Sequence, residues 1–144
     1  MTGTIKYKIL MILFVLALVS SALLAFNGFN GTGVCDPNVE GCSTVSLSEY
    51  STTFGIENSY YGVIIFLFLI FVTYSHIKKQ SKFKSSIIKM GVIVGTIIAI
   101  YFIYLQQFVI GAWCKYCLIT DFAMIIAFGI VFFSWRRKRK WNLE

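Results

Sequence analysis

Two cysteines three residues apart, Cys114 and Cys117, carry the clearest chemistry in this chain. They lie in the stretch Trp113-Cys114-Lys115-Tyr116-Cys117, where a short turn runs into the last long apolar segment. At the start of a helix this spacing puts both thiols on nearly the same face, close enough to form a disulfide. The positive end of the helix dipole favours a thiolate over a thiol. The pair is therefore a candidate redox site.

The elements that must position this pair are four long apolar runs. The chain has 144 residues, 58% of them hydrophobic, which is a length typical of one domain. A run of about 20 apolar residues is long enough to cross a bilayer. The sequence predicts a single all-α integral membrane domain, residues 1–144, built as a bundle of four transmembrane helices. The expected spans are residues 6–26, 59–77, 87–110 and 115–135, and the first is expected to be retained rather than cleaved as a signal.

The net charge of +7 is distributed unevenly along the chain. If the chain crosses four times, twelve of the 13 basic residues fall on one side. These twelve are Lys6, Lys8, Lys78, Lys79, Lys82, Lys84, Lys89, Arg136, Arg137, Lys138, Arg139 and Lys140. The positive-inside rule then predicts a multi-pass protein of the cell membrane with both termini in the cytoplasm. This distribution argues against a basic surface for nucleic acid, so no nucleic-acid partner is expected.

The segment 27–58 is expected to be an outer loop with two different halves. Its first half is rich in Gly and polar residues, which favours turns, and contains Cys35 and Cys42. Its second half, residues 43–54, has apolar residues at roughly helical spacing among Ser and Thr. We expect a short amphipathic helix here that caps the outer mouth of the bundle.

The predicted topology places all four cysteines on the outer side, where disulfides persist. Two inert disulfides in a non-enzymatic membrane scaffold would satisfy this count. A relay is favoured because a bond between Cys114 and Cys117 closes almost no loop and so constrains the unfolded chain little. A movable Cys35/Cys42 pair beside a fixed one also suits thiol–disulfide exchange. No metal is expected, because a four-cysteine zinc site does not need a pair at a helix end.

Three further residues are candidates for binding. Asp121 lies one helical turn deeper than Cys117 on the same face, and an acid inside a span is a functional candidate, here as a proton donor or hydrogen-bond partner. Asn58 is either the N-cap of the second span or an amide donor to the carbonyl of a bound ring. Gly62 permits close approach of a helix or ligand. Cys117 would face an apolar pocket that a lipid-soluble electron carrier could enter.

The ordered set of motifs resembles the vitamin K epoxide reductase family. The set comprises the loop pair Cys35 and Cys42, the segment 54–62 (FGIENSYYG), and a C-x-x-C at Cys114 that opens the last of four spans. The chain looks most like the small prokaryotic members, which act as DsbB-type oxidases. The resemblance implies a four-helix bundle around a quinone of the menaquinone, ubiquinone or vitamin K type.

The resemblance also implies a role for each site residue. Cys117 would face the quinone with Cys114 as its partner, Cys42 would exchange with Cys114, and Cys35 would meet an external thioredoxin-like (DsbA-like) protein. Asn58 matches the ring-binding Asn of the family. The sequence departs from vertebrate members at Asp121, where they carry a Tyr.

We therefore expect a thiol–quinone oxidoreductase that moves electrons from a secreted dithiol protein through two cysteine pairs to a membrane quinone. Such an enzyme supports disulfide bond formation. One alternative is a vitamin K epoxide or quinone reductase that uses the same relay. The alternative from another class is the disulfide-stapled scaffold.

Overall fold

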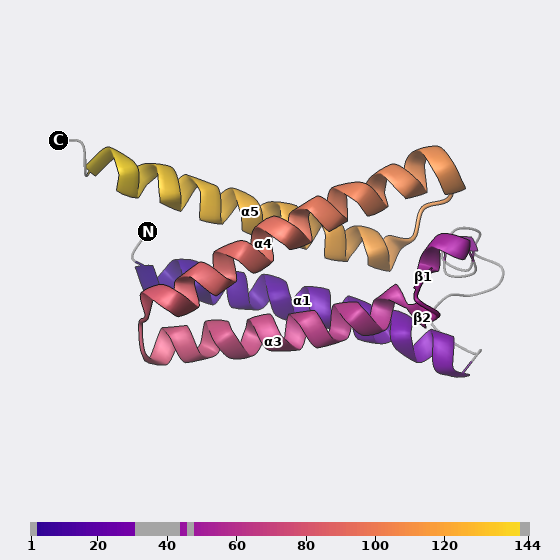
Figure 1. The fold of residues 1–144 in the computed structure, drawn as a ribbon, viewed down its shortest axis with the longest axis horizontal. Helices are drawn as coiled ribbons and strands as arrows, with labels where there is room; N and C mark the ends of the chain where they lie inside the picture. Colours follow the sequence, from indigo (N-terminus) through magenta and orange to yellow (C-terminus); the bar gives the residue numbers. More distant parts are fainter. Residues whose placement is uncertain (1–2, 31–43, 46–47, 142–144) are drawn as a thin grey trace.

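The computed structural model describes residues 3–30, 44–45 and 48–141, and four long helices dominate it (Figure 1). The helices are α1 Gly3–Asn30, α3 Asn58–Lys78, α4 Lys82–Tyr104 and α5 Lys115–Trp141. Each contains one of the four apolar runs, and each is long and apolar enough to cross a membrane, α4 together with the turn that continues it. Helix α4 begins at Lys82, ahead of the expected residue 87, because polar residues there extend the helix beyond the apolar run.

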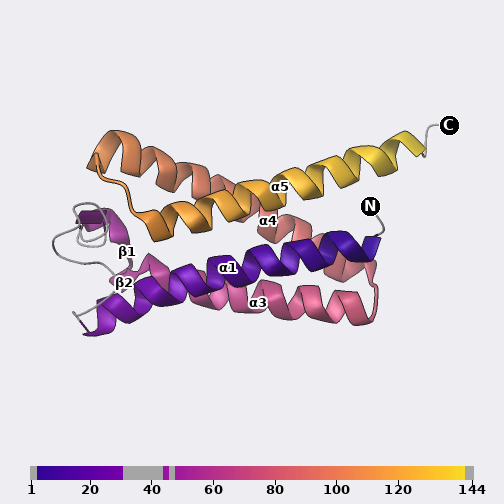
Figure 2. The same ribbon diagram turned by 180° about the vertical axis from the view of Figure 1, so that it is seen from behind.

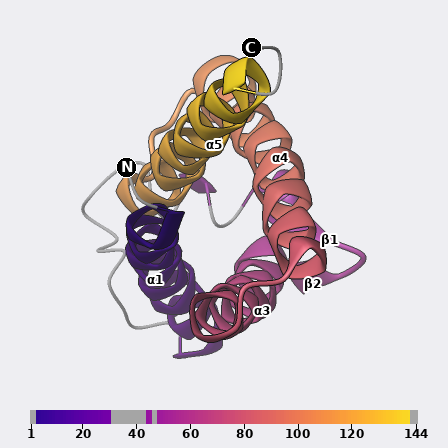
Figure 3. The same cartoon turned by 90° about the vertical axis from the view of Figure 1, so that its left-hand side faces the viewer.

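The four helices run alternately in opposite directions. Both termini and the short turn between α3 and α4 lie at one end of the bundle, and the connections α1–α3 and α4–α5 lie at the other (Figures 1 and 2). Viewed along the bundle, the helices are arranged around a ring, in the order α1, α3, α4, α5 (Figure 3). Helix α1 packs against α3 and α5, and α4 packs against α5 and α3. The fold is therefore an antiparallel four-helix bundle, as expected.

The closest packing lies in the half of the bundle that holds the termini. Fully buried side chains there include Leu10 and Phe14 of α1, Leu69 of α3, and Ile88 and Val92 of α4. They form one continuous apolar cluster, which α5 completes from its middle onward. Within a bilayer such interdigitation, rather than exclusion of water, supplies most of the attraction between helices.

The outer surface of the bundle is also apolar. Large side chains from every helix point outward, among them Ile12, Ile64, Phe71, Ile97 and Phe133. An exposed apolar surface of this extent is unusual for a protein surrounded by water. The surface is the one expected of helices that contact lipid.

Polar contacts join three helices at the end with the termini. The hydroxyl of Tyr7 lies 2.7 Å from that of Ser85, and its ring packs against His76 with centroids 4.2 Å apart. The backbone N–H of Ser81 donates to Nδ1 of His76, and Lys84 contacts Ser75. These contacts tie α1, α3 and α4 together beside the turn that joins α3 to α4.

A small hairpin lies at the opposite end, between α1 and α3. It consists of a 3₁₀ turn, Glu49–Ser51, and two short strands, β1 Thr52–Thr53 and β2 Ile56–Glu57, which pair antiparallel. The amphipathic helix expected over residues 43–54 is therefore wrong from Glu49 onward, while residues 43, 46 and 47 lie outside the described residues. The Ser and Thr residues of this segment favour caps and turns over helix interiors, which explains the difference.

The turn of this hairpin has an unusual backbone. Its two central residues, Phe54 and Gly55, both have positive φ, of 56° and 80°. This is the pattern of a type I′ turn, which matches the twist of paired strands. Glycine adopts positive φ freely, but for a bulky residue such as Phe54 it is strained. The Phe54 side chain is 97% exposed at the tip.

The connection between α4 and α5 has two special features. The last turns of α4 continue as a π-helical segment, η2 Leu105–Ile110, which ends at Gly111. Gly111 has a φ of 67°, the left-handed conformation that commonly terminates a helix. Helix α5 then begins at Lys115, so Cys114 directly precedes it. This geometry fixes Cys114 at the N-cap position of α5.

The glycines of α4 serve two different neighbours. A side chain at Gly91 would collide with Leu69 of α3, and one at Gly95 would collide with Met124 of α5. The two positions, four residues apart, therefore face separate helices. The Thr96 hydroxyl donates to the carbonyl of Val92 at 2.7 Å and also lies 3.2 Å from the carbonyl of Met124, so a polar contact adds to the second packing contact.

Candidate functional site

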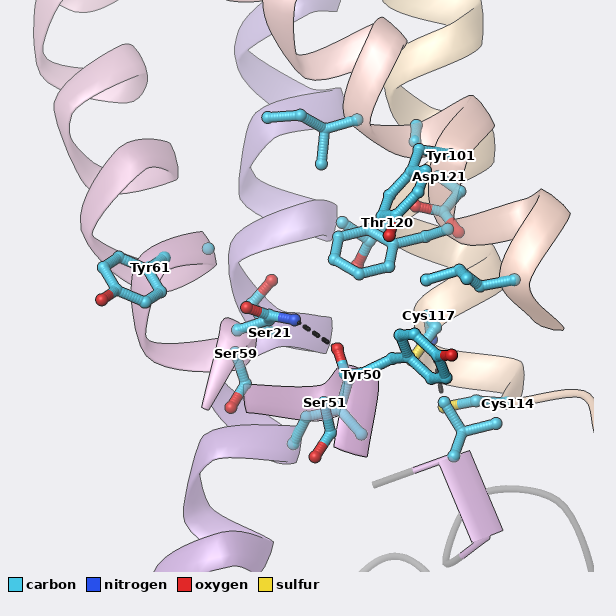
Figure 4. Close-up of a pocket in the computed structure, with 18 of the residues that line it drawn as sticks. Ser21, Tyr50, Ser51, Ser59, Tyr61, Tyr101, Cys114, Cys117, Thr120 and Asp121 are labelled. Carbon is cyan, nitrogen blue, oxygen red and sulfur yellow. Dashed lines mark hydrogen bonds between the residues drawn. The ribbon is translucent and has the colours of Figure 1, made fainter. Parts of the chain in front are cut away.

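A cavity of about 580 Å³ lies inside the bundle at the end that carries the hairpin. All four long helices, η2 and the hairpin contribute to its wall, and the wall is mostly apolar. This volume falls within the range typical of sites for small molecules. Five of the predicted site residues line it: Asn58, Gly62, Cys114, Cys117 and Asp121. Figure 4 shows several of its polar side chains.

Cys114 and Cys117 lie at the start of α5, where the helix backbone supports the first sulfur. The carbonyl of Cys114 accepts the N–H of Leu118 at 3.0 Å, and its Sγ accepts the N–H of Cys117 at 3.4 Å. Cys114 thus acts as an N-cap through its sulfur, in the manner of a Ser or Asp side chain. Cys114 is 1% exposed, whereas Cys117 is only partly buried. Both sulfurs belong to the wall of the cavity.

This environment favours the thiolate of Cys114. A hydrogen bond from the Cys117 side chain lowers the pKa of the Cys114 thiol to about 7, aided by the backbone N–H groups of Cys117 and Tyr116 and opposed by burial. The shift favours the thiolate, which is the form that attacks a disulfide. The two cysteines therefore have different environments, because Cys114 is fully buried and Cys117 only partly.

Asp121 lies one turn further along α5 and is 5% exposed. Its Oδ2 lies 3.5 Å from Nε2 of Gln106, which is itself buried in η2. The Oε1 of Gln106 accepts the backbone N–H of Cys114 at 3.0 Å. A single amide therefore contacts both the carboxyl group and the backbone of the first cysteine.

Asn58 is the first residue of α3, and its side chain holds the hairpin. Its Oδ1 accepts the hydroxyl of Thr53 at 2.6 Å, and its Nδ2 donates to the carbonyl of Tyr50 at 2.9 Å. The expectation that Asn58 caps the helix is wrong, because Glu57 occupies the N-cap position. The amide bonds to the loop instead, so it braces the cavity wall from the side opposite α5.

The hairpin forms the outer wall of the cavity opposite the cysteines. In Figure 4 the ring of Tyr50 points from the hairpin toward Cys114 and Cys117. The hydroxyl of Tyr61 on α3 donates to the carbonyl of Thr53 at 3.3 Å and fixes the hairpin from below. This part of the loop covers the site, as the expected capping role requires, although its conformation differs.

Gly62 lies where α1 and α3 approach each other within the cavity wall. A side chain at this position would come within 2.9 Å of Oγ of Ser21 on α1. The glycine therefore lets the two helices pack closely where the cavity begins. The sequence anticipated close approach of a helix or a ligand at Gly62, and the structure shows the helix.

The remaining predicted residues, Cys35 and Cys42, lie outside the described residues, so their exchange with Cys114 stays a prediction. Within residues 3–30, 44–45 and 48–141, no group of three His, Cys, Asp or Glu side chains lies together to hold a metal ion.

The sequence did not single out Gln106 for a role at the site. Nothing in the sequence pattern connects Gln106 to Cys114 or Asp121. The available signal was a neutral amide at the end of a long apolar run, where a buried polar group needs partners. The aromatic residue Tyr50 was placed on the expected loop helix, but not beside the cysteines.

Comparison with known proteins places the chain in a family. No curated protein matches the chain at a significant level. A sequence model of the "Vitamin K epoxide reductase family" matches residues 8–132, which contain α3, α4, the C-x-x-C and most of α1 and α5. The match spans most of the chain and agrees with the bundle and its cavity. The chain therefore belongs to the vitamin K epoxide reductase family and is a multi-pass membrane oxidoreductase.

Proposed function

We propose that the protein is a thiol–quinone oxidoreductase that supports disulfide bond formation outside the cytoplasm. The observation that carries the proposal is the position of Cys114 and Cys117, which open a membrane helix and line a mostly apolar cavity. A buried acid, Asp121, lies one turn beyond them in the same cavity. Thiols, an apolar site within a membrane bundle and a group able to exchange protons are what two-electron transfer to a lipid-soluble acceptor requires.

The cavity fits the ring of a quinone of the menaquinone, ubiquinone or vitamin K type. Its volume of about 580 Å³ suits a small ligand, and side chains such as Ile65, Ile98 and Phe102 supply apolar surface. Polar groups enter at defined places, with Asn58 on one wall and Asp121 on another. A bound quinone would supply an acceptor for two electrons and two protons.

The residues of the chain then have separate roles. Oxidation of Cys114 and Cys117 to a disulfide releases two electrons and two protons. Cys117 lies deeper along α5 and is the residue expected to face the acceptor, while Asp121 transfers or shares a proton beside it. The second N–H of the Asn58 amide remains available to a ring carbonyl, because Nδ2 makes a single hydrogen bond, to Tyr50, within the described residues.

The proposed source of electrons is an external thioredoxin-like (DsbA-like) dithiol protein. It would exchange with Cys35 and Cys42, and Cys42 would exchange with Cys114. The lowered pKa of the Cys114 thiol supports this step in two ways. The thiolate is the form that attacks a disulfide, and a thiol of lower pKa leaves faster when a disulfide that contains it is attacked. The basic residues gather at the end of the bundle opposite the cysteines, so we place the termini in the cytoplasm and the cavity at the outer face.

A substitution at Cys117 tests the proposal. The reduced protein in lipid nanodiscs is mixed anaerobically with a water-soluble quinone, and the quinone absorbance is followed. We expect the reduced wild type to reduce about two quinones per chain, one for each dithiol pair of the relay, and Cys117→Ala to reduce quinone at least about a thousandfold more slowly. Ser134→Ala, further along the same helix, is the control. Quinone reduction by Cys117→Ala at the wild-type rate would refute the proposal.

The same variant separates a relay from a stapled scaffold. In Cys117→Ala, the Cys114 thiolate can attack an oxidised Cys35–Cys42 pair at Cys42 and release Cys35. The resulting Cys42–Cys114 bond can revert through Cys35 but cannot pass forward to Cys117, so a relay retains this bond on mixing with the oxidised form of the dithiol protein. The bond is detected by mass spectrometry of the unreduced protein. An unreactive Cys114 together with a permanent Cys35–Cys42 bond would favour the scaffold instead.

Vitamin K epoxide reduction is the second candidate, and the family match favours it. The epoxide would draw on the same thiols, so supplying it in place of quinone to the reduced protein distinguishes the two acceptors. We expect quinone to be reduced and the epoxide not, because Asp121 stands where vertebrate members of the family carry a Tyr.

A further inference from the structure

Two consecutive glutamines in η2 have opposite environments. The side chain of Gln106 is 2% exposed and lines the cavity, whereas that of Gln107 is exposed. π-Helical segments are rare and occur frequently at functional sites. Gln106 therefore has a defined place in the cavity wall, and Gln107 provides a matched control on the same segment.

Both ends of the Gln106 amide are engaged, and their orientation is fixed. The amide oxygen accepts the N–H of Cys114 at 3.0 Å, a contact that the nitrogen cannot make because it only donates. The NH₂ group must then point the other way, and it lies 3.5 Å from Oδ2 of Asp121. The bridge joins residues from η2, from the linker and from α5 at one point.

We propose that Gln106 is a positioning residue for Cys114, and that its amide bridges the Cys114 backbone to the Asp121 carboxyl group so that the start of α5 is held against the cavity. The positioning role of Gln106 adds to the proposed function. Only its consequence, that Gln106 supports electron transfer, rests on that function. The positioning itself is a property of the fold.

The need for such a bridge follows from the linker. Residues 111–114 belong to no helix or strand, and Cys114 at the end of this linker is buried. A buried N–H without an acceptor is costly, and here the acceptor is Gln106. If the linker shifts, the Sγ of Cys114 also loses its place over the N–H of Cys117, which is part of what favours its thiolate.

The first experiment compares Gln106→Met with Gln107→Met. Methionine keeps the length of the side chain but cannot make either hydrogen bond. The rate at which iodoacetamide alkylates Cys114 is measured against pH, in nanodiscs, after reduction. Trypsin cleaves after Lys115, so Cys114 and Cys117 fall in separate peptides and mass spectrometry follows each one.

We expect a midpoint near pH 7 for Cys114 in the wild type and in Gln107→Met. In Gln106→Met the pKa of Cys114 should rise toward the ordinary thiol value of about 8.5, because its sulfur is no longer held at the helix N-terminus. A change in the accessibility of Cys114 alters its alkylation rate equally at every pH and does not move the midpoint.

Other titratable groups line the cavity with Cys114. They are Cys117 and Asp121 of α5, Tyr50 and Glu57 of the hairpin, Tyr61 of α3 and Tyr101 of α4.

A second variant separates the bridge from the acid. Asp121→Asn retains an oxygen that accepts from Gln106, so the bridge persists while the ionisable group is removed. We expect Asp121→Asn to exchange with an external dithiol at close to the wild-type rate and to reduce quinone slowly. Gln106→Met should slow both half-reactions, the exchange by about tenfold for the loss of the bridging contacts.

If Gln106→Met does not fold, Gln106→Asn keeps an amide that is one methylene too short to reach both partners, and the same rise in midpoint is expected. An unchanged midpoint in a folded Gln106 variant, or an equal rise in Gln107→Met, would overturn the inference. If the wild type reduces no quinone but Gln106→Met still shifts the Cys114 midpoint, the proposed function fails and the positioning role stands.

Discussion

The two ends of the bundle are built on different principles. At the end with the termini, large side chains such as Leu10, Phe14 and Leu69 interlock, and Tyr7, His76 and Ser85 close the packing. At the other end the helix faces carry polar groups into a cavity, and a hairpin rather than helix packing covers it. The helices pack tightly against one another at the first end, and at the second end they enclose the cavity that holds the cysteines.

The path of α4 produces this difference. Helices α3 and α4 meet at their short turn and diverge toward the opposite end, and α4 crosses α5 near the middle of the bundle (Figure 1). Gly91 lets α4 approach Leu69 of α3 in the packed half, and Gly95, one turn later, lets it approach Met124 of α5 beside the cavity. Stability and activity should therefore respond to substitutions at opposite ends.

The largest effect is expected from removing a packed side chain. Leu10→Ala should destabilise the bundle by about 2–5 kcal/mol, because Leu10 is completely buried and its neighbours cannot fill the space. Unfolding is measured by thermal melting in nanodiscs, with Ile12→Ala on the exposed face of α1 as the control. Quinone reduction per folded molecule should not change, and a loss of rate without a loss of stability would contradict the division between the two ends.

The second effect concerns the acid in the cavity. Asp121→Asn should slow quinone reduction by about a hundredfold, the lower end of what a positioned proton donor contributes. Its melting temperature should stay close to that of the wild type, because the amide keeps the contact with Gln106. Single-turnover quinone reduction measures the step. Equal rates for both proteins at all pH values would show that Asp121 only completes the polar network.

Much of the bundle could be predicted from the sequence because each helix contains a long run of apolar residues. Four long apolar runs specify four helices, and the basic residues specify which ends lie together. The helix ends extend beyond the expected spans because hydrophobicity marks the bilayer and not the helix: α1 reaches Asn30 and α5 reaches Trp141. The hairpin was missed because its turn, Phe54-Gly55, carries one glycine and a residue unsuited to positive φ.

The site was predictable where the chemistry is local. Asp121 lies one turn from Cys117, so helical geometry alone joins them. The link from Gln106 to Cys114 and Asp121 was not predictable, because it spans a π-helical segment and a left-handed glycine whose directions no periodic pattern specifies. Likewise Asn58 bonds to Tyr50, a contact that exists only because the hairpin turns the chain back.

Substitutions at Gly91 and Gly95 of α4 allow a direct comparison of the packed half of the bundle with the cavity. Gly91→Ala should cost about 1–3 kcal/mol of stability, because its new methyl group meets the buried Leu69 in the packed half. Gly95→Ala should cost less, because the flexible end of Met124 can move aside. Because Gly95 and Met124 both line the cavity, a displaced Met124 side chain should occupy part of it and raise the apparent Michaelis constant for quinone. Melting curves and steady-state kinetics of both variants check the pair, and the reverse pattern would place the cavity elsewhere.

The smallest effect is expected at the tip of the hairpin. Phe54→Asn places at this position a residue that tolerates positive φ and favours type I′ turns before glycine, so it should stabilise the hairpin locally by about 1 kcal/mol. Slower hydrogen exchange at the amides of Thr53 and Ile56 would measure it. Global melting should not change, because the hairpin lies at the open end and its strands contribute little to the packed core. Faster exchange in Phe54→Asn would mean that the Phe54 side chain holds the hairpin in place through contacts with lipid, and that the strain at its backbone is compensated there.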